Sequence, residues 1–172
     1  MPRALFLVGD RFEDLSLFLP WYRLREEGVE VTLASSLLHG LTGIHGYCVE
    51  PDCRINDVTP TDFDLLVIPD GSSMTESLRM REEALDVTRT LAQEGRVAAI
   101  GHGAQVLQSA GALDGRTVTA SPGIRDDIRA AGALYKDEAV VLDGNMLTGR
   151  SVDDLPEFNR ALVRFLRQIV KV

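Results

Sequence analysis

The stretch AAIGHGAQVL, residues 98–107, runs from an apolar segment through a glycine and a histidine into a pattern typical of a helix. A strand that turns sharply into a helix holds the residue at the turn in an exposed, strained position above backbone N–H groups. A nucleophile is suited to this position, because the N–H groups favour negative charge. Gly101 occupies it here without a side chain, so the neighbouring His102 is the first side chain able to carry chemistry.

The segments around this turn indicate an α/β fold. Short apolar runs alternate with longer amphipathic segments, as in a parallel sheet that helices cover on both faces. Core strands are expected at 4–10, 30–36, 63–71 and 96–101, with shorter strands at 115–121, 139–145 and 146–150. Helices are expected at 14–28, 75–94, 102–113, 124–133 and 155–170, and a hairpin-like excursion at 37–57. We predict a flavodoxin-like doubly wound sandwich, built as one domain over residues 1–172, with the turn at the carboxyl ends of the strands.

Composition excludes two classes of partner. The chain has 26 acidic and 18 basic residues and a net charge of −8, which disfavours the phosphate contacts that dominate nucleic-acid affinity. No apolar stretch approaches the roughly 20 residues that a membrane span needs, so we expect a cytoplasmic protein without a membrane partner. Cys48 and Cys53 are expected to be reduced thiols, since their spacing points them to opposite faces of an extended segment.

Six motifs in order resemble those of the PfpI intracellular protease family. This family is part of the class I glutamine amidotransferase-like superfamily, which includes the parkinsonism-associated protein deglycase. The resemblance covers nearly the whole chain. It rests on FEDLSLFLPWYRLREEG, TGIHGYCV, FDLLVIPDG, AAIGHGAQVLQSAGALDGR, SPGIRDDIRAAGA and DGNMLTGRSVDDLPEF.

The resemblance implies a set of site residues. The family's nucleophile is a cysteine thiolate followed by histidine, and Gly101 and His102 stand at these two positions. Glu13 matches the glutamate beside the thiol. Glu76 matches an acidic residue supplied by a neighbouring subunit, if one inserted residue is allowed just before it. Gly71 and the N–H of His102 match the donors that stabilise an oxyanion.

Departures from the family pattern gather around the same site. Asp70 precedes Gly71 where relatives have two glycines, and Ser121 stands where close relatives have tyrosine. Several changes in one pocket indicate natural divergence rather than a single engineered replacement. Two interpretations of Asp70 stay open, because Asp-Gly is also a favoured turn pair.

These observations predict a protein without covalent cysteine chemistry. Its pocket is expected to bind a small carbonyl or carboxylate ligand, or to serve a stress-related or assembly role, without a cofactor. An alternative is a hydrolase or lyase in which His102 or one of the carboxylates Glu13, Asp70 and Glu76 activates water.

A divalent metal held by the histidine and these carboxylates is a further alternative. No ligand spacing in the sequence favours it, so no metal is expected. The resemblance also implies a homodimer or a larger even-numbered assembly, because Glu76 would act across a subunit interface.

Overall fold

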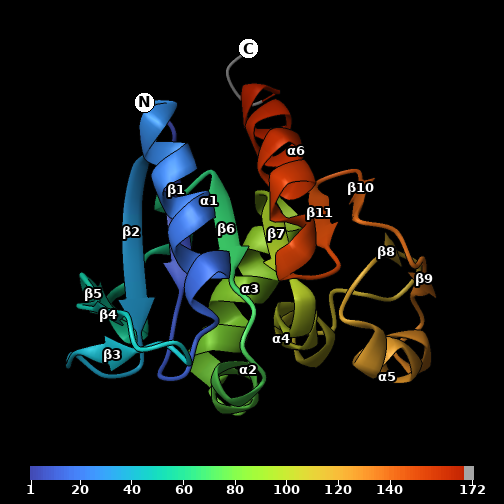
Figure 1. Ribbon diagram of the computed structural model, residues 1–172, viewed down its shortest axis with the longest axis horizontal. Coiled ribbons are helices and arrows are strands. Elements are labelled where there is room, and N and C mark those ends of the chain that lie inside the picture. The colour runs from blue at the N-terminus through green and yellow to red at the C-terminus, as the bar shows by residue number, and fades with distance from the viewer. Residues whose placement is uncertain (169–172) are drawn as a thin grey trace.

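The computed structural model describes residues 1–168 and is built on a seven-stranded sheet (Figure 1). The strand order is β10-β11-β7-β6-β1-β2-β5. The strands are β1 (Arg3–Leu7), β2 (Glu30–Ser35), β5 (Cys53–Arg54), β6 (Leu65–Ile68), β7 (Val97–Ile100), β10 (Val140–Asp143) and β11 (Met146–Gly149). Only β10 runs antiparallel to its neighbour. The predicted, mostly parallel sheet is therefore confirmed.

Helices cover both faces of this sheet. On one face, α1 (Asp14–Glu26) and α6 (Leu155–Arg167) pack against each other, and they lie in front of the strands in Figure 1. On the other face lie α2 (Ser72–Arg79), α3 (Glu82–Glu94) and α4 (Ala104–Ser109). Every residue of β6 and β7 is buried. Burial from both sides explains why these strands have continuous apolar sequences.

Several predicted segments are shorter in the structure, and two contain more elements than expected. The helical region expected at 75–94 consists of two helices, because the backbone at Arg81 is extended (φ −105°, ψ 113°). The interruption lets α2 pack on α4 while α3 packs on β6 and β7. The excursion at 37–57 contains the expected hairpin, β3 (Leu41–Thr42) and β4 (Cys48–Val49), but it also adds β5 to the main sheet beside β2.

The C-terminal half adds a smaller layer beside the main sheet. The short strands β8 (Thr117–Val118) and β9 (Leu134–Tyr135) pair in a separate two-stranded sheet, with α5 (Arg125–Ala130) against β9. The predicted last helix is confirmed as α6, while residues 169–170 of that prediction lie outside the described residues. Within residues 1–168, no helix combines the length and apolar character of a membrane span.

The carboxyl ends of the parallel strands meet at one edge of the sheet. The segments that leave β1, β6 and β7 there carry Glu13, Asp70 and Gly101. Residues far apart in the sequence are brought together at this edge, where ligands bind in open parallel sheets.

Candidate functional site

Gly101 forms the turn between β7 and α4. It begins a 3₁₀ turn that spans Gly101–Gly103, and its φ of +56° lies in the left-handed region. Residues with a Cβ adopt this region at a cost, whereas glycine does so freely. The predicted strand-to-helix turn is therefore present, and its geometry accounts for a glycine at position 101. Gly101 is buried, however, and not exposed as expected, because the Asp70 carboxylate lies against it.

The carboxylate of Asp70 fills the space beside Gly101. A Cβ atom at position 101 would lie 2.7 Å from Asp70 Oδ1 and still closer to Cγ and Oδ2. Carbon and oxygen atoms that are not bonded to each other do not approach so closely, so any side chain at position 101 would require Asp70 to move. Asp70 therefore faces the turn at Gly101, which decides between the two interpretations left open by the sequence.

Three nitrogen atoms surround one oxygen of this carboxylate. Asp70 Oδ1 accepts hydrogen bonds from the backbone N–H groups of Gly71, at 2.7 Å, and His102, at 2.9 Å. His102 Nδ1 lies 3.0 Å from the same oxygen. The two N–H groups that the resemblance identifies as oxyanion donors thus converge on one point, and a carboxylate of the chain itself occupies that point.

The interaction with Asp70 changes the acidity of His102. The hydrogen bond to Asp70 raises the pKa of the His102 ring, and the negative charge of Asp70 adds to this effect, while burial acts in the opposite direction. The side chain is 30% exposed. Among the described residues, His102 Nε2 has no hydrogen-bond partner, so this nitrogen is available to a ligand.

Glu13 contacts the Asp70 segment through the backbone. Its buried carboxylate caps α1 by accepting a hydrogen bond from Ser16 N at 2.7 Å, and its own N–H donates to the carbonyl of Asp70 at 2.9 Å. Ser16 Oγ in turn accepts a hydrogen bond from Asp70 N at 2.9 Å. The start of α1 is therefore fastened to the segment that holds Asp70.

Two further residues at this edge were not identified from the sequence. His45 Nε2 lies 3.7 Å from Glu13 Oε1. The adjacent Asp14, which is 1% exposed, accepts hydrogen bonds from the N–H groups of His45 and Tyr47. Gly43 lies against Asp14, since a Cβ there would collide with the Asp14 carboxylate, but this contact is visible only in the tertiary structure.

Glu13, Asp14 and His45 offer atoms that could ligate a metal ion. One ligand atom of each lies within 4.8 Å of the others. However, the carboxylates already accept hydrogen bonds from backbone N–H groups of α1 and of the segment after β3. Helix capping and loop attachment are therefore sufficient reasons for this cluster.

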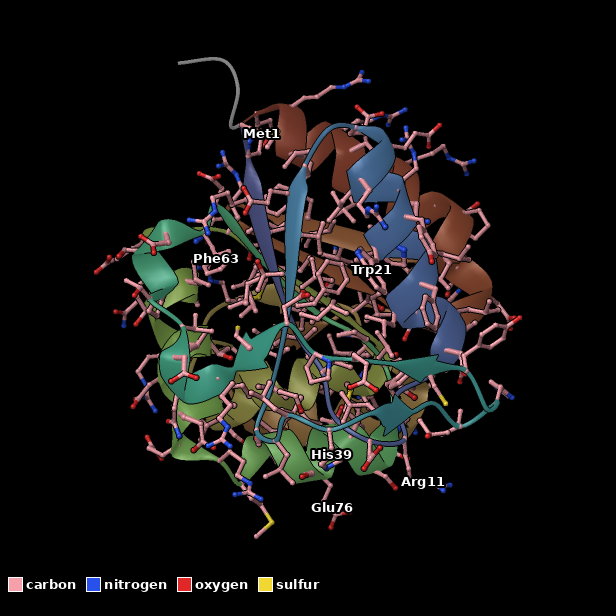
Figure 2. All side chains as sticks on the ribbon, turned by 90° about the vertical axis from the view of Figure 1, so that its left-hand side faces the viewer. Met1, Arg11, Trp21, His39, Phe63 and Glu76 are labelled. Carbon is pink, nitrogen blue, oxygen red and sulfur yellow. The ribbon has the colours of Figure 1, made fainter. Side chains whose placement is uncertain are left out.

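The remaining predicted site residues lie apart from this network. Glu76 is exposed on α2, and Figure 2 shows it at the surface of the molecule. Ser121 is half-buried and precedes a 3₁₀ turn that starts at Pro122. Within the part of the chain that the structure describes, no hydrogen bond or ion pair joins either residue to Asp70 or His102. Their roles stay predictions.

Both cysteines are free thiols, as predicted. Cys48 is exposed and Cys53 is half-buried. Burial raises the pKa of the Cys53 thiol, and the charges of Asp52 and Asp57 raise it further. Because the thiolate is the reactive form, Cys53 is less suited than Cys48 to nucleophilic chemistry at neutral pH.

Comparisons with known proteins agree with this architecture. The family model described as DJ-1/PfpI family matches residues 2–165. An uncharacterized protein of Archaeoglobus fulgidus is 50% identical over 167 residues, which cover 96% of this chain and 99% of that protein. Deglycase PfpI of Pyrococcus furiosus is 43% identical over 166 residues, with coverage of 96% and 99%.

A solved structure also superposes closely on this chain. It is a two-domain protein of Anabaena variabilis that contains DJ-1/ThiJ/PfpI-like and ferritin-like domains. The TM-score is 0.93 at 30% sequence identity, and the match covers 96% of this chain and 48% of the two-domain protein. The family resemblance and the flavodoxin-like fold predicted from the sequence are thereby confirmed.

Proposed function

This chain belongs to the DJ-1/PfpI family, and we propose that it retains the family's elbow without catalysis by a cysteine thiolate. The observation that carries this proposal is the position of the Asp70 carboxylate. It occupies the space that a side chain at position 101 needs, and it accepts hydrogen bonds from the backbone N–H groups of Gly71 and His102. Both the nucleophile and the free oxyanion donors are then missing from the same place.

We further propose that the site binds a small neutral carbonyl compound without forming a covalent bond. Relatives of this chain are named deglycases, which makes carbonyl compounds the first class to consider. His102 Nε2 is the group able to donate a hydrogen bond to a carbonyl oxygen when the ring is protonated or carries its proton there. The fixed negative charge of Asp70 disfavours a carboxylate ligand, which was the other class expected from the sequence.

Calorimetric titration with dihydroxyacetone and with glycerate at equal ionic strength tests this proposal. We expect dihydroxyacetone to bind and glycerate to bind more weakly. His102→Ala should abolish binding of dihydroxyacetone, whereas the matched change His39→Ala, at an exposed histidine outside the elbow, should not alter it. Equal binding to wild type and His102→Ala would refute a ligand site at His102.

A second candidate function is water activation by His102. It is favoured by the 3.0 Å contact between His102 Nδ1 and Asp70 Oδ1, because a carboxylate in this position orients a histidine as a general base. Water would transfer a proton to His102 Nε2 while its oxygen attacks a carbonyl carbon. The protonated ring would then return this proton to the leaving group as the tetrahedral intermediate collapses. A hydrolase or lyase activity that persists after alkylation and disappears in His102→Ala would support this candidate.

The proposed assembly is a homodimer or a larger even-numbered oligomer. Exposed apolar side chains support it: Leu15, Leu19 and Tyr22 on α1 lie on the same side as Tyr47, whose ring meets that of Phe18 with centroids 5.7 Å apart. An exposed apolar surface of this kind is typical of an interface. Light scattering should give an even multiple of 18.9 kDa; a monomer alone at micromolar concentration would refute the assembly.

A further inference from the structure

A small pocket lies at the carboxyl ends of β1 and β2, apart from the elbow residues. Its volume is about 100 Å³, the space of roughly three water molecules. Figure 2 shows His39, one of its lining residues, at the same end of the molecule as Glu76. The polar side chains that line the pocket are Asp10, Ser35, Ser36, His39, Ser77 and Arg81.

Hydroxyl groups provide the first argument for a ligand. Ser35 ends β2, is only 3% exposed and is one of the residues that line the pocket. Its hydroxyl forms no hydrogen bond with any residue in the range 1–168, so it can bond to an occupant of the pocket. Ser36, which is half-buried, and Ser77, which is exposed, also line the pocket, and their hydroxyls have no partner among the described residues. Three hydroxyl donors can therefore reach an occupant of the pocket.

The balance of charge provides the second argument. Arg81 forms no ion pair or side-chain hydrogen bond with the part of the chain that the structure describes. It directly precedes α3, whose first turn carries Glu82 and Glu83, and neither glutamate lines the pocket. Asp10 is the opposing charge in the pocket wall, and its Oδ1 accepts a hydrogen bond from Thr42 N at 3.0 Å.

We propose that this pocket binds a tetrahedral oxyanion, either free phosphate or the phosphate group of a small monoester. A guanidinium group binds two phosphate oxygens at once, and hydroxyl groups can donate to the others. A divalent cation would need several carboxylate ligands, and Asp10 is the only acidic residue that lines the pocket. This inference does not depend on the function proposed for the elbow.

Calorimetric titration with inorganic phosphate, at constant ionic strength, tests the site. We expect saturable binding at about millimolar concentration, and weaker binding of acetate. Arg81→Gln should weaken phosphate binding by about tenfold, and Ser35→Ala should also weaken it. Arg164→Gln, an exposed arginine on α6, is the matched control and should leave binding unchanged.

Asp10→Asn gives the sharpest test, because it removes the opposing charge while its amide oxygen can still accept from Thr42 N. Phosphate should then bind severalfold more tightly. Titration with glycerol 2-phosphate distinguishes a monoester site, which binds both compounds, from a site closed to all but the free ion. Phosphate binding that is absent, that equals acetate binding, or that survives Arg81→Gln in a folded variant would overturn the proposal.

Discussion

Two histidines lie beside carboxylates at the same edge of the sheet, but only one is anchored to its partner. The backbone N–H of His102 donates a hydrogen bond to Asp70 Oδ1 at 2.9 Å, and the ring Nδ1 of His102 lies 3.0 Å from the same oxygen. His45 Nε2 lies 3.7 Å from Glu13 Oε1, and its side chain is 66% exposed. The carboxylate of Glu13 is instead directed by the first turn of α1.

This difference teaches that proximity of a histidine to a carboxylate does not by itself make a proton-transfer pair. Asp70 is directed at His102 by the turns on which both residues lie, so the pair is preorganised. Glu13 and Asp14 have a structural role, because their carboxylates accept hydrogen bonds from backbone N–H groups of α1 and of the segment after β3. The first pair is suited to chemistry and the second to holding the site together.

The largest effect is expected from Gly101→Cys. The new side chain would meet both a left-handed backbone and the Asp70 carboxylate. We expect the free energy of unfolding to fall by about 2–5 kcal/mol, measured by urea denaturation. Gly111→Cys is the matched control, because Gly111 also has positive φ but has nothing within 4 Å of its Cβ position; an equal loss in both variants would contradict the proposed collision.

Adding Asp70→Gly to Gly101→Cys should recover part of this loss. The effects of the two changes on the free energy of unfolding should differ from their sum by about 1–3 kcal/mol, because Asp70→Gly removes the carboxylate that collides with the new side chain. The introduced thiol should react with iodoacetamide faster than Cys48. Its weak catalysis should increase in the double variant, because the N–H groups of Gly71 and His102 are released from Asp70 and could then stabilise an oxyanion. Strictly additive stability effects would show that Asp70 does not occupy this space.

A smaller effect is expected from Asp14→Ala, which tests the other region. It leaves the N–H groups of His45 and Tyr47 without their acceptor. Stability should fall by about 2–3 kcal/mol, while ligand binding at His102 is retained. Asp126→Ala, an exposed carboxylate on α5, should change stability by less than about 0.5 kcal/mol.

The pH dependence of stability should report the anchored histidine. The pKa of His102 is raised above its ordinary value of 6.5, so the folded protein binds this proton more tightly than the unfolded chain. The resulting stabilisation is complete below about pH 6.5 and is lost as pH rises through the raised pKa. Asp70→Asn should lower the pKa of His102 in an NMR titration, and it should flatten this part of the stability profile. An unchanged pKa would contradict the pairing.

The smallest effect is expected from alkylation of the wild-type protein. Iodoacetamide should modify Cys48 before Cys53, because Cys48 is exposed and burial raises the pKa of Cys53. Any activity or ligand binding should survive the modification, as followed by mass spectrometry and calorimetry. Loss of activity in step with alkylation would mean that one of these cysteines acts as a nucleophile, contrary to the proposal.

Most of the fold could be predicted from the sequence because its signals are local. Residues 97–100 and 65–68 are continuous apolar runs, and such runs indicate strands that are buried on both faces. The division of residues 75–94 into two helices could not be predicted in this way. It depends on the different directions in which α2 meets α4 and α3 meets the sheet, and these directions arise only when the layers pack.

The candidate site was only partly predictable for the same reason. Gly101, His102 and Glu13 were found because they lie within motifs of the family pattern. His45 was missed because its partner, Glu13, is separated from it by 32 positions in the sequence, and their approach requires α1 and the hairpin to meet.

The sequence by itself determined the sheet, the glycine at the turn and the absence of a cysteine from it, since each depends on residue type and neighbours along the chain. Only the tertiary structure decided the role of Asp70. A carboxylate after β6 can turn to solvent or cap its own loop, and the sequence is the same in either case. Parallel pairing of β6 with β7 places the carboxylate beside Gly101, where the missing side chain leaves room and two N–H groups attract its charge.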